Sequence, residues 1–298
     1  MKNKVIVITG PTGVGKTKIS IEIAKALETE IINGDAYQIY QKMNIGTAKP
    51  TKEELEKVKH HFFDFLDPLC EFSVSDYQVR IRKLIDDFHK EKKIPLIVGG
   101  TGLYIDSVIK NYQFLAPKRN EEKYDNLSNE ELHKNLQKLD YEASLKIHMN
   151  NRKRVLRAIE LANTQDFESR TLKNEFYYDA LIIFLNEDRE VLYERINHRV
   201  DKMFSDGLLE EVEALYPNCL GKTAKAAIGY KELFQYFNNE ISLEYAINKI
   251  KQNSRHYAKR QLTWYRNKEN TIFVNVNYNN LTETSNEVLK IINNFLKD

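Results

Sequence analysis

The chain has 298 residues and a formal net charge of only +2, and it contains two cysteines. A chain of this length can bury a core without covalent cross-links, and Cys70 and Cys219 lack the spacing of a zinc site or a CxxC motif. The apolar run near the start is too short for a signal peptide, and no run is long enough to span a membrane. We therefore expect a soluble, cytoplasmic protein.

Short β-branched runs alternate with segments of helical spacing along most of the chain. We expect strands at residues 5–9, 30–35, 94–100, 180–185 and 272–276. Apolar residues spaced three or four apart indicate helices over residues 19–27, 77–88 and 288–296. Ser75 and Gln78 would form a capping box at the start of the second of these helices. The alternation predicts an α/β fold, with a mostly parallel sheet and helices on both faces.

The strand signal disappears in the middle of the chain. From residue 117 to residue 178 the sequence is polar and helical, and it begins with a charged, loop-like stretch at residues 118–131. We interpret 117–178 as a helical insertion domain. The α/β core then consists of residues 1–116 and 179–298, with the C-terminal helices belonging to that core.

A glycine-rich segment follows the first expected strand and precedes the first expected helix. It reads GPTGVGKT and fits the phosphate-binding loop G-x-x-x-x-G-K-[ST] in the context that this motif requires. We expect its residues to bind a diphosphate: Gly10, Pro11, Thr12, Gly13, Val14, Gly15, Lys16 and Thr17. Backbone N–H groups would surround the phosphate oxygens, Lys16 would add a positive charge, and the Thr17 hydroxyl could ligate Mg²⁺. The alternative is a merely tight turn.

The acid that most nucleotide hydrolases place at the end of a second strand is missing here. Residues 94–98 run into Gly99, Gly100 and Thr101 without a carboxylate. Asp35, at the end of another expected strand, is then the acid nearest to the phosphate loop, since ligands bind at the carboxyl ends of parallel strands. An aspartate that only caps its loop is the alternative. The pattern counts against an ordinary NTPase.

Six sequence blocks stand out along the chain: GPTGVGKT (10–17), GDAYQIYQKMNIGTAKP (34–50), KHHFFD (59–64), VGGTGLY (98–104), AIGYKEL (227–233) and YAKRQLTWYR (257–266). In this order they resemble the signature blocks of the bacterial tRNA dimethylallyltransferases, or IPP transferase family. The resemblance covers nearly the whole chain and implies a P-loop NTPase-like fold. It also implies transfer of a dimethylallyl group from dimethylallyl diphosphate to N6 of the adenine immediately 3′ of the tRNA anticodon, with release of diphosphate and help from Mg²⁺.

The resemblance further implies which residues act. Asp35 matches the general base, which would accept a proton as the C–N bond forms. Lys16, Thr17 and Arg199 match groups that stabilise the departing diphosphate, and Thr101 matches a threonine near donor and acceptor. Arg199 belongs to a basic helical stripe with Arg195 and Lys202, for which a solvated helix face is the alternative.

The resemblance also assigns the contacts with tRNA. The target nucleotide would meet Thr101 and the segment Asp35, Ala36, Tyr37 and Gln38, in which Ala36 stands where the family usually has serine. Two basic stretches without acids, 249–268 and 146–157, suggest surfaces for a polyanion. From these we expect contacts with the anticodon stem-loop by Arg255, Lys259, Arg260, Trp264 and Arg266, and by Lys153, Arg154 and Arg157. For Tyr257 and Trp264, packing in the core is an equal alternative.

Other functions fit parts of the same pattern. A P-loop small-molecule or nucleoside kinase would share the phosphate loop, the sheet and a lid-like insertion. An RNA-binding NTPase switch would share the basic stretches, and a transferase acting on free adenine nucleotides would share the chemistry. We assign no chemistry to His60 and His61 and expect a monomer. The preferred tRNAs are not encoded in any readable motif.

Overall fold

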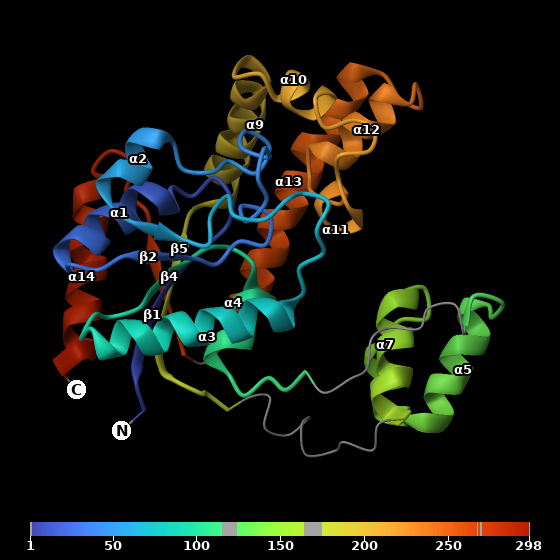
Figure 1. Ribbon diagram of the computed structural model, residues 1–298, viewed down its shortest axis with the longest axis horizontal. Coiled ribbons are helices and arrows are strands. Elements are labelled where there is room, and N and C mark those ends of the chain that lie inside the picture. Colours follow the sequence, from blue (N-terminus) through green and yellow to red (C-terminus); the bar gives the residue numbers. More distant parts are fainter. Residues whose placement is uncertain (1, 115–123, 164–174, 267, 269, 298) are drawn as a thin grey trace. The chain divides into compact units, whose positions relative to one another are not determined.

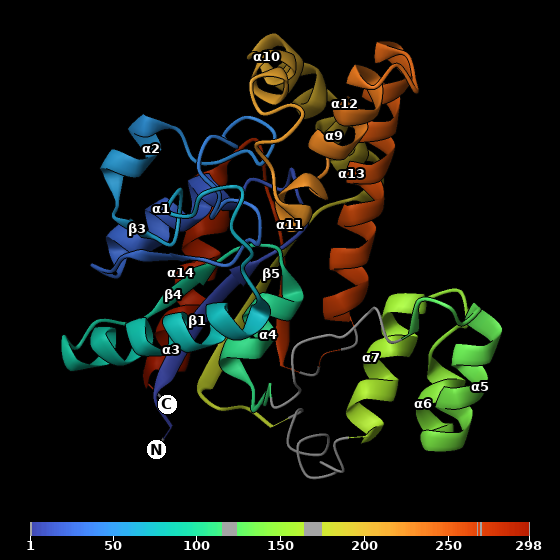
Figure 2. The same ribbon diagram turned by 45° about the vertical axis from the view of Figure 1, so that its right-hand side comes forward.

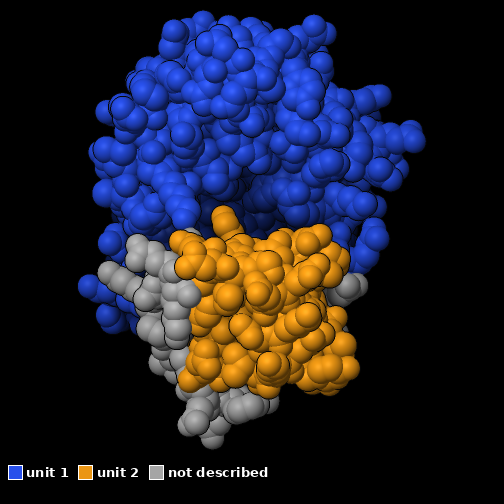
Figure 3. Space-filling view, turned by 90° about the vertical axis from the view of Figure 1, so that its right-hand side faces the viewer, with its two compact units in different colours: residues 1–109, 176–298 blue, residues 110–175 orange. Residues whose placement is uncertain are grey.

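The computed structural model describes residues 2–114, 124–163, 175–266, 268 and 270–297. The chain divides into two compact units, one formed by Met1–Ile109 with Phe176–Asp298 and the other by Lys110–Glu175 (Figure 3). The second unit begins before the predicted boundary at 117, which lies outside the described residues, as does the first part of the predicted loop 118–131. It ends before the predicted boundary at 178 because Tyr178 is buried in the core of the larger unit.

The larger unit is built on a parallel six-stranded sheet of order β3-β2-β4-β1-β5-β6, which confirms the predicted α/β class. The strands are β1 (Lys4–Thr9), β2 (Ile31–Asn33), β3 (His60–His61), β4 (Leu96–Val98), β5 (Asp179–Asn186) and β6 (Thr271–Asn275). The two-residue β3 is too short to leave an alternating pattern and was not predicted.

Helices cover both faces of this sheet, as predicted (Figure 1). Ile6 and Ile8 of β1 face a cluster formed with α1 (Lys16–Ala26), α14 (Leu281–Lys297) and α9 (Arg189–Ser205). Val5 and Val7 point the other way, into a cluster with α3 (Val74–Lys90) and α4 (Gly102–Ile109). Alternate residues of one buried strand therefore serve two cores, which explains its continuous apolar run.

The start of α3 differs from the prediction. Ser73 is the N-cap, and its hydroxyl accepts a hydrogen bond from the Asp76 N–H at 3.1 Å while the Asp76 carboxylate accepts from the Ser73 N–H at 2.9 Å. The predicted capping box of Ser75 and Gln78 is wrong, because both residues already lie within the helix and the Gln78 amide donates instead to the Ser107 carbonyl at 2.6 Å. Asp76, the third residue of α3, completes the capping box in place of the expected glutamine.

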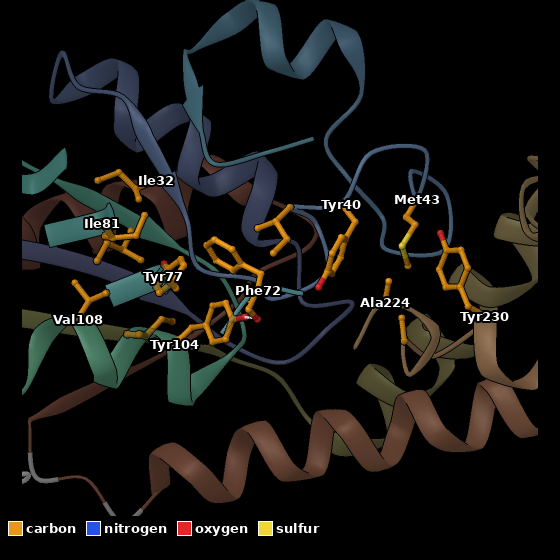
Figure 4. Close-up of a cluster of buried hydrophobic side chains, with 14 of the residues drawn as sticks. Ile32, Tyr40, Met43, Phe72, Tyr77, Ile81, Tyr104, Val108, Ala224 and Tyr230 are labelled. Atoms are coloured by element: carbon orange, nitrogen blue, oxygen red, sulfur yellow. Dashed lines mark hydrogen bonds between the residues drawn. The ribbon is translucent and has the colours of Figure 1, made fainter. Parts of the chain in front are cut away.

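A group of helices extends the larger unit beyond the carboxyl ends of the strands (Figure 2). After α9 come α10 (Leu208–Glu213), α11 (Lys222–Lys225), α12 (Tyr230–Phe237) and the long α13 (Leu243–Arg266), while α2 (Lys52–Lys57) precedes β3. One apolar cluster continues from Ile32 and Tyr77 at the sheet to Ala224 and Tyr230 among these helices (Figure 4). This shared core joins the helices to the sheet as one unit.

The smaller unit is helical in its described part, with α5 (Asn129–Leu139), α6 (Tyr141–Lys146) and α7 (Arg152–Asn163). Leu132 and Leu136 of α5 pack against Val155 and Ile159 of α7. Among the described residues of the whole chain, no helix is both long and apolar enough to cross a membrane.

Candidate active site

The glycine-rich segment forms the loop between β1 and α1, in the strand–loop–helix context that the sequence predicts. Its three glycines all have positive φ, and a Cβ on Gly10 would lie 2.5 Å from the Leu185 carbonyl oxygen. Larger residues would therefore strain or displace the loop. The conformation turns the start of α1 toward the carboxyl edge of the sheet, where the positive end of the helix favours an anion.

Lys16 lies across this loop. Its ammonium donates to the carbonyl oxygens of Gly10 and Pro11, both at 2.9 Å. Its pKa is lowered to about 7, mainly by burial and also by the nearby Arg199, while the charge of Asp35 partly offsets these two effects. A diphosphate would supply the negative charge that this ammonium lacks, so the loop is prepared for an anion rather than for a neutral ligand.

Two arginines of α9 reach the same loop. The half-buried Arg199 donates from Nη1 to the Thr12 hydroxyl at 2.8 Å, and burial lowers its pKa while Asp35 opposes that shift. Arg195 is exposed, donates to the Gly13 carbonyl at 3.2 Å and stacks 3.6 Å from the Tyr278 ring centre. Lys202, the third member of the predicted stripe, is exposed and paired with Asp206, so the solvated-face interpretation holds for this residue alone.

Asp35 follows β2 and is held from several sides. Its carboxylate accepts from the Tyr37 N–H at 2.9 Å, and its own N–H donates to the Asn33 side chain at 2.8 Å. Burial raises the pKa of Asp35, whereas the hydrogen bond from Tyr37 and the charge of Lys16 lower it. Asp35 thus caps its loop, as the alternative interpretation has it, and it also faces the cations of the phosphate loop.

Thr101 and Gln38 organise the backbone around Asp35. The Thr101 hydroxyl accepts from the Ala36 N–H at 3.0 Å, so it holds the residue after Asp35 through the main chain. The Gln38 amide donates to the carbonyl oxygens of Thr47 and Ala48, at 3.1 and 2.9 Å. Thr101 reaches Ala36 through the main chain, so this hydrogen bond does not depend on the side-chain hydroxyl of the serine that the family usually has at this position.

Two cavities meet at Asp35. A polar cavity of about 290 Å³ is lined by the phosphate loop, including Gly13, Gly15, Lys16 and Thr17. An apolar cavity of about 250 Å³ is lined by Ile196, Val200 and Met203 of α9, by residues 226–229 and by Ile250 of α13. Five residues line both cavities: Thr12, Asp35, Thr47, Arg199 and Tyr257. A charged group in one cavity and an apolar group in the other would therefore share a boundary at Asp35.

Helix α13 connects this site to a basic surface. Gln261 is buried, accepts from the Thr12 N–H at 2.9 Å and donates to the Gly100 carbonyl at 2.9 Å. It joins the phosphate loop to the segment after β4, a role that its place among basic residues did not indicate. Among the predicted tRNA-binding residues of α13, Arg255 is half-buried and four are exposed: Lys259, Arg260, Trp264 and Arg266.

The two aromatic residues of α13 have different environments. Trp264 is 41% exposed and its indole covers Gly102, where a Cβ would lie 2.5 Å from the ring, so it is not a core residue. Tyr257 is half-buried and lines both cavities. In the smaller unit, Lys153 and Arg154 are exposed and Arg157 pairs with Glu160.

A model of the family described as IPP transferase matches residues 38–268 of this chain. The chain belongs to the IPP transferase family. The phosphate loop lies ahead of the matched region, so its geometry is a separate observation. A tRNA dimethylallyltransferase of Bacillus anthracis is 46% identical over 98% of this chain and 96% of its own length.

Solved structures of this family also resemble the chain. The tRNA isopentenylpyrophosphate transferase of Bacillus halodurans is 40% identical, with a TM-score of 0.74 and coverage of 99% of both chains. The corresponding enzyme of Staphylococcus epidermidis is 42% identical, with a TM-score of 0.73 over 98% of this chain and 99% of its own. A eukaryotic dimethylallyltransferase acting on tRNA is 28% identical, with a TM-score of 0.83 over 99% of this chain and 80% of its own. The similarity to these IPP transferases favours the transferase interpretation of this chain over the kinase alternative.

Proposed function

We propose that this protein transfers a dimethylallyl group from dimethylallyl diphosphate to N6 of the adenine immediately 3′ of the tRNA anticodon, with release of diphosphate. The observation that carries the proposal is the meeting of a cationic polar cavity and an apolar cavity at the half-buried carboxylate of Asp35. The names of the IPP transferase relatives, which include tRNA dimethylallyltransferases, support the same reaction.

The donor fits the two cavities by its own polarity. Its diphosphate would lie in the polar cavity, where the N–H groups of the loop and the Lys16 ammonium replace water around the phosphate oxygens. Its five-carbon tail would lie in the apolar cavity against Ile196, Val200 and Met203. Arg199 lines both cavities, so its cation would lie beside the bond that breaks, where negative charge grows on the leaving oxygen.

Magnesium fits this site as a companion of the diphosphate. Thr17 lines the polar cavity, and the oxygens of its hydroxyl and of the substrate phosphates are ligands that Mg²⁺ prefers. Among the described residues, no group of three or more His, Cys, Asp or Glu side chains could hold a metal by itself, so Thr17 would hold the ion together with substrate phosphates. When bound, the ion would neutralise charge on the diphosphate.

In the proposed reaction, Asp35 accepts the proton that the acceptor amine loses. The N6 amine attacks the allylic carbon, the new C–N bond forms as the C–O bond to diphosphate breaks, and a proton passes from nitrogen to the carboxylate. Because the amine lone pair is delocalised into the ring, its orientation matters. Tyr257 would set it from the wall of the site, and Thr101 would hold the backbone next to Asp35. Burial raises the pKa of this carboxylate, which favours its acceptance of the proton.

The tRNA itself would bind the exposed face of α13. Lys259, Arg260 and Arg266 supply cations for phosphates, and Trp264 supplies an exposed ring on which a base can stack. The target adenine must leave the loop stack to reach Asp35. Lys153, Arg154 and Arg157 of the smaller unit are proposed as a second contact. We also propose that the protein is a monomer and acts in the cytoplasm.

The test is a direct assay of the tRNA product. Protein, Mg²⁺, dimethylallyl diphosphate and unmodified tRNA that reads codons beginning with U are incubated, and the nucleoside masses are measured. We expect addition of one C5H8 unit to adenosine, with the rate reduced at least about 100-fold in Asp35→Ala. The exposed Asp86→Ala on α3 is the matched control and should keep the full rate. Absence of the added mass, together with phosphate transfer from ATP to a small molecule, would replace this proposal with the kinase.

A further inference from the structure

A loop that lines both cavities is fastened by one carboxylate. Glu211 of α10 accepts hydrogen bonds from three consecutive backbone N–H groups: Asn44 at 2.8 Å, Ile45 at 2.8 Å and Gly46 at 3.0 Å. Its oxygen Oε2 serves the first two and Oε1 serves the third. Successive N–H groups that point inward form an anion-binding concavity. In this protein the anion is an internal side chain from a helix about 165 residues away in the chain.

A tyrosine completes this arrangement. The Tyr230 hydroxyl, at the start of α12, donates to the same Oε1 of Glu211 at 2.6 Å. The Tyr230 ring lies against Gly46 so closely that a Cβ on this glycine would be 2.5 Å from ring atom Cε2. Figure 4 shows this ring beside Met43, the residue that precedes the loop. Burial raises the pKa of Tyr230, and the Glu211 charge raises it further, so the hydroxyl stays protonated and remains a donor.

The fastened loop forms a wall of the proposed donor site. Gly46 and Thr47 line the apolar cavity, together with residues that include Ala227 and Gly229. Thr47 and Ala48 line the polar cavity, and their carbonyl oxygens accept the hydrogen bonds of Gln38, three residues after Asp35. The loop is thus held between two anchors, Glu211 on one side and the Asp35 segment on the other. Loss of one anchor would free one side of the cavity wall.

We propose that Glu211 is a positioning residue that fixes residues 44–48 as the wall of the apolar cavity and thereby limits the length of the prenyl donor. This inference rests on the proposed function, because it assigns the apolar cavity to the donor tail. Glu211 does not line either cavity, so its effect on the donor passes through the loop. Charge-assisted hydrogen bonds to three N–H groups and a hydroxyl make this anchor stronger than neutral ones would be.

The first test is Glu211→Gln, which keeps the size of the side chain. However the amide is placed, its NH2 group faces hydrogen-bond donors, since each carboxylate oxygen now accepts two hydrogen bonds. We expect the KM for dimethylallyl diphosphate to rise about tenfold, with the tRNA Kd unchanged. We also expect the rate with the longer donor geranyl diphosphate to rise relative to that with the natural donor. A general loss of folding would lower kcat without this change in donor preference.

Matched variants keep the inference open to refutation even if Glu211→Gln folds poorly. The exposed neighbour Glu210→Gln, on the same helix, should behave like the wild type. Tyr230→Phe, which removes one donor and keeps the ring, should give the same change in donor preference at smaller size, and Gly46→Ala should displace the loop with Glu211 intact. Unchanged donor KM and donor preference in the folded variants, with a wild type that prenylates tRNA, would overturn this inference and leave the proposed function standing. A wild type that transfers no prenyl group would overturn both.

Discussion

The two cavities that meet at Asp35 are built in different ways. The polar cavity takes most of its phosphate-binding groups from one continuous segment, residues 10–17, whose backbone is shaped by glycines with positive φ. The apolar cavity is assembled from α9, the start of α10, residues 226–229 and α13. A site made of backbone N–H groups can be encoded locally, whereas a site made of packed side chains requires the whole arrangement of helices.

The two cavities should also contribute to different kinetic constants. Groups of the polar cavity face charge that grows as the diphosphate leaves, so they act on the transition state and on kcat. Groups of the apolar cavity hold the donor tail equally before and during reaction, so they act on the donor KM. Substitutions in one cavity or the other can break this distinction.

The largest effect is expected for Lys16→Ala. Removal of this ammonium leaves the departing diphosphate with one charge fewer, and kcat should fall about 100-fold to 1,000-fold. Single-turnover measurement of prenylated tRNA gives the rate. Lys18→Ala, an exposed lysine one half-turn further along α1, is the control. If Lys16→Ala changed only the donor KM, the polar cavity would act in binding alone and the distinction between the cavities would be lost.

The pH dependence of kcat/KM should report the ionisation of two groups in the polar cavity, Asp35 and Lys16. Asp35 must be deprotonated to act, and its pKa is raised by burial, so kcat/KM falls as the pH drops through that raised value. Lys16 must be protonated, and its pKa is about 7 in the free protein, so kcat/KM falls again above about pH 7. Each limb should reach about tenfold per pH unit. The alkaline limb of kcat should lie at higher pH, because bound diphosphate favours the ammonium. An alkaline limb of kcat/KM that survives in Lys16→Ala would assign it to another group.

The smallest effect is expected for Met203→Phe in the apolar cavity. This half-buried residue lines the space proposed for the donor tail, and the larger ring should cost about 1 kcal/mol of donor binding, or about fivefold in donor KM. Steady-state kinetics at saturating tRNA measure it, with kcat nearly unchanged. The exposed Val191→Phe on the same helix is the matched control. A fall in kcat at constant KM would show that the apolar cavity is not where the tail binds.

Much of the fold follows from local patterns. The buried residues Leu192, Ile196 and Val200 of α9 have the spacing of an apolar helix face, and the carboxyl ends of the parallel strands place Asp35 beside the phosphate loop. The predicted capping box of α3 is two residues too late, because both Ser73 and Ser75 fit the sequence pattern of an N-cap. The strand β3 was not predicted, because its two residues are too few to show an alternating pattern.

The contacts between distant segments could not be predicted in this way. Gln261 sits among basic residues on α13, yet only the packing of that helix on the phosphate loop reveals its two buried hydrogen bonds. Glu211 looks like any helical glutamate until the loop at residues 44–46 folds against it. Arg199 and Lys202 share one helical stripe, and only the first is turned toward the site.

The sequence by itself determined the phosphate loop, the alternation of strands and helices, and the position of Asp35 near that loop, because each depends on neighbouring residues and on the fixed geometry of a parallel sheet. The tertiary structure alone decided the second cavity, the anchor at Glu211 and the bridge at Gln261. These features depend on side chains from segments far apart in the chain, whose hydrogen bonds and packing exist only once the helices have assembled on the sheet.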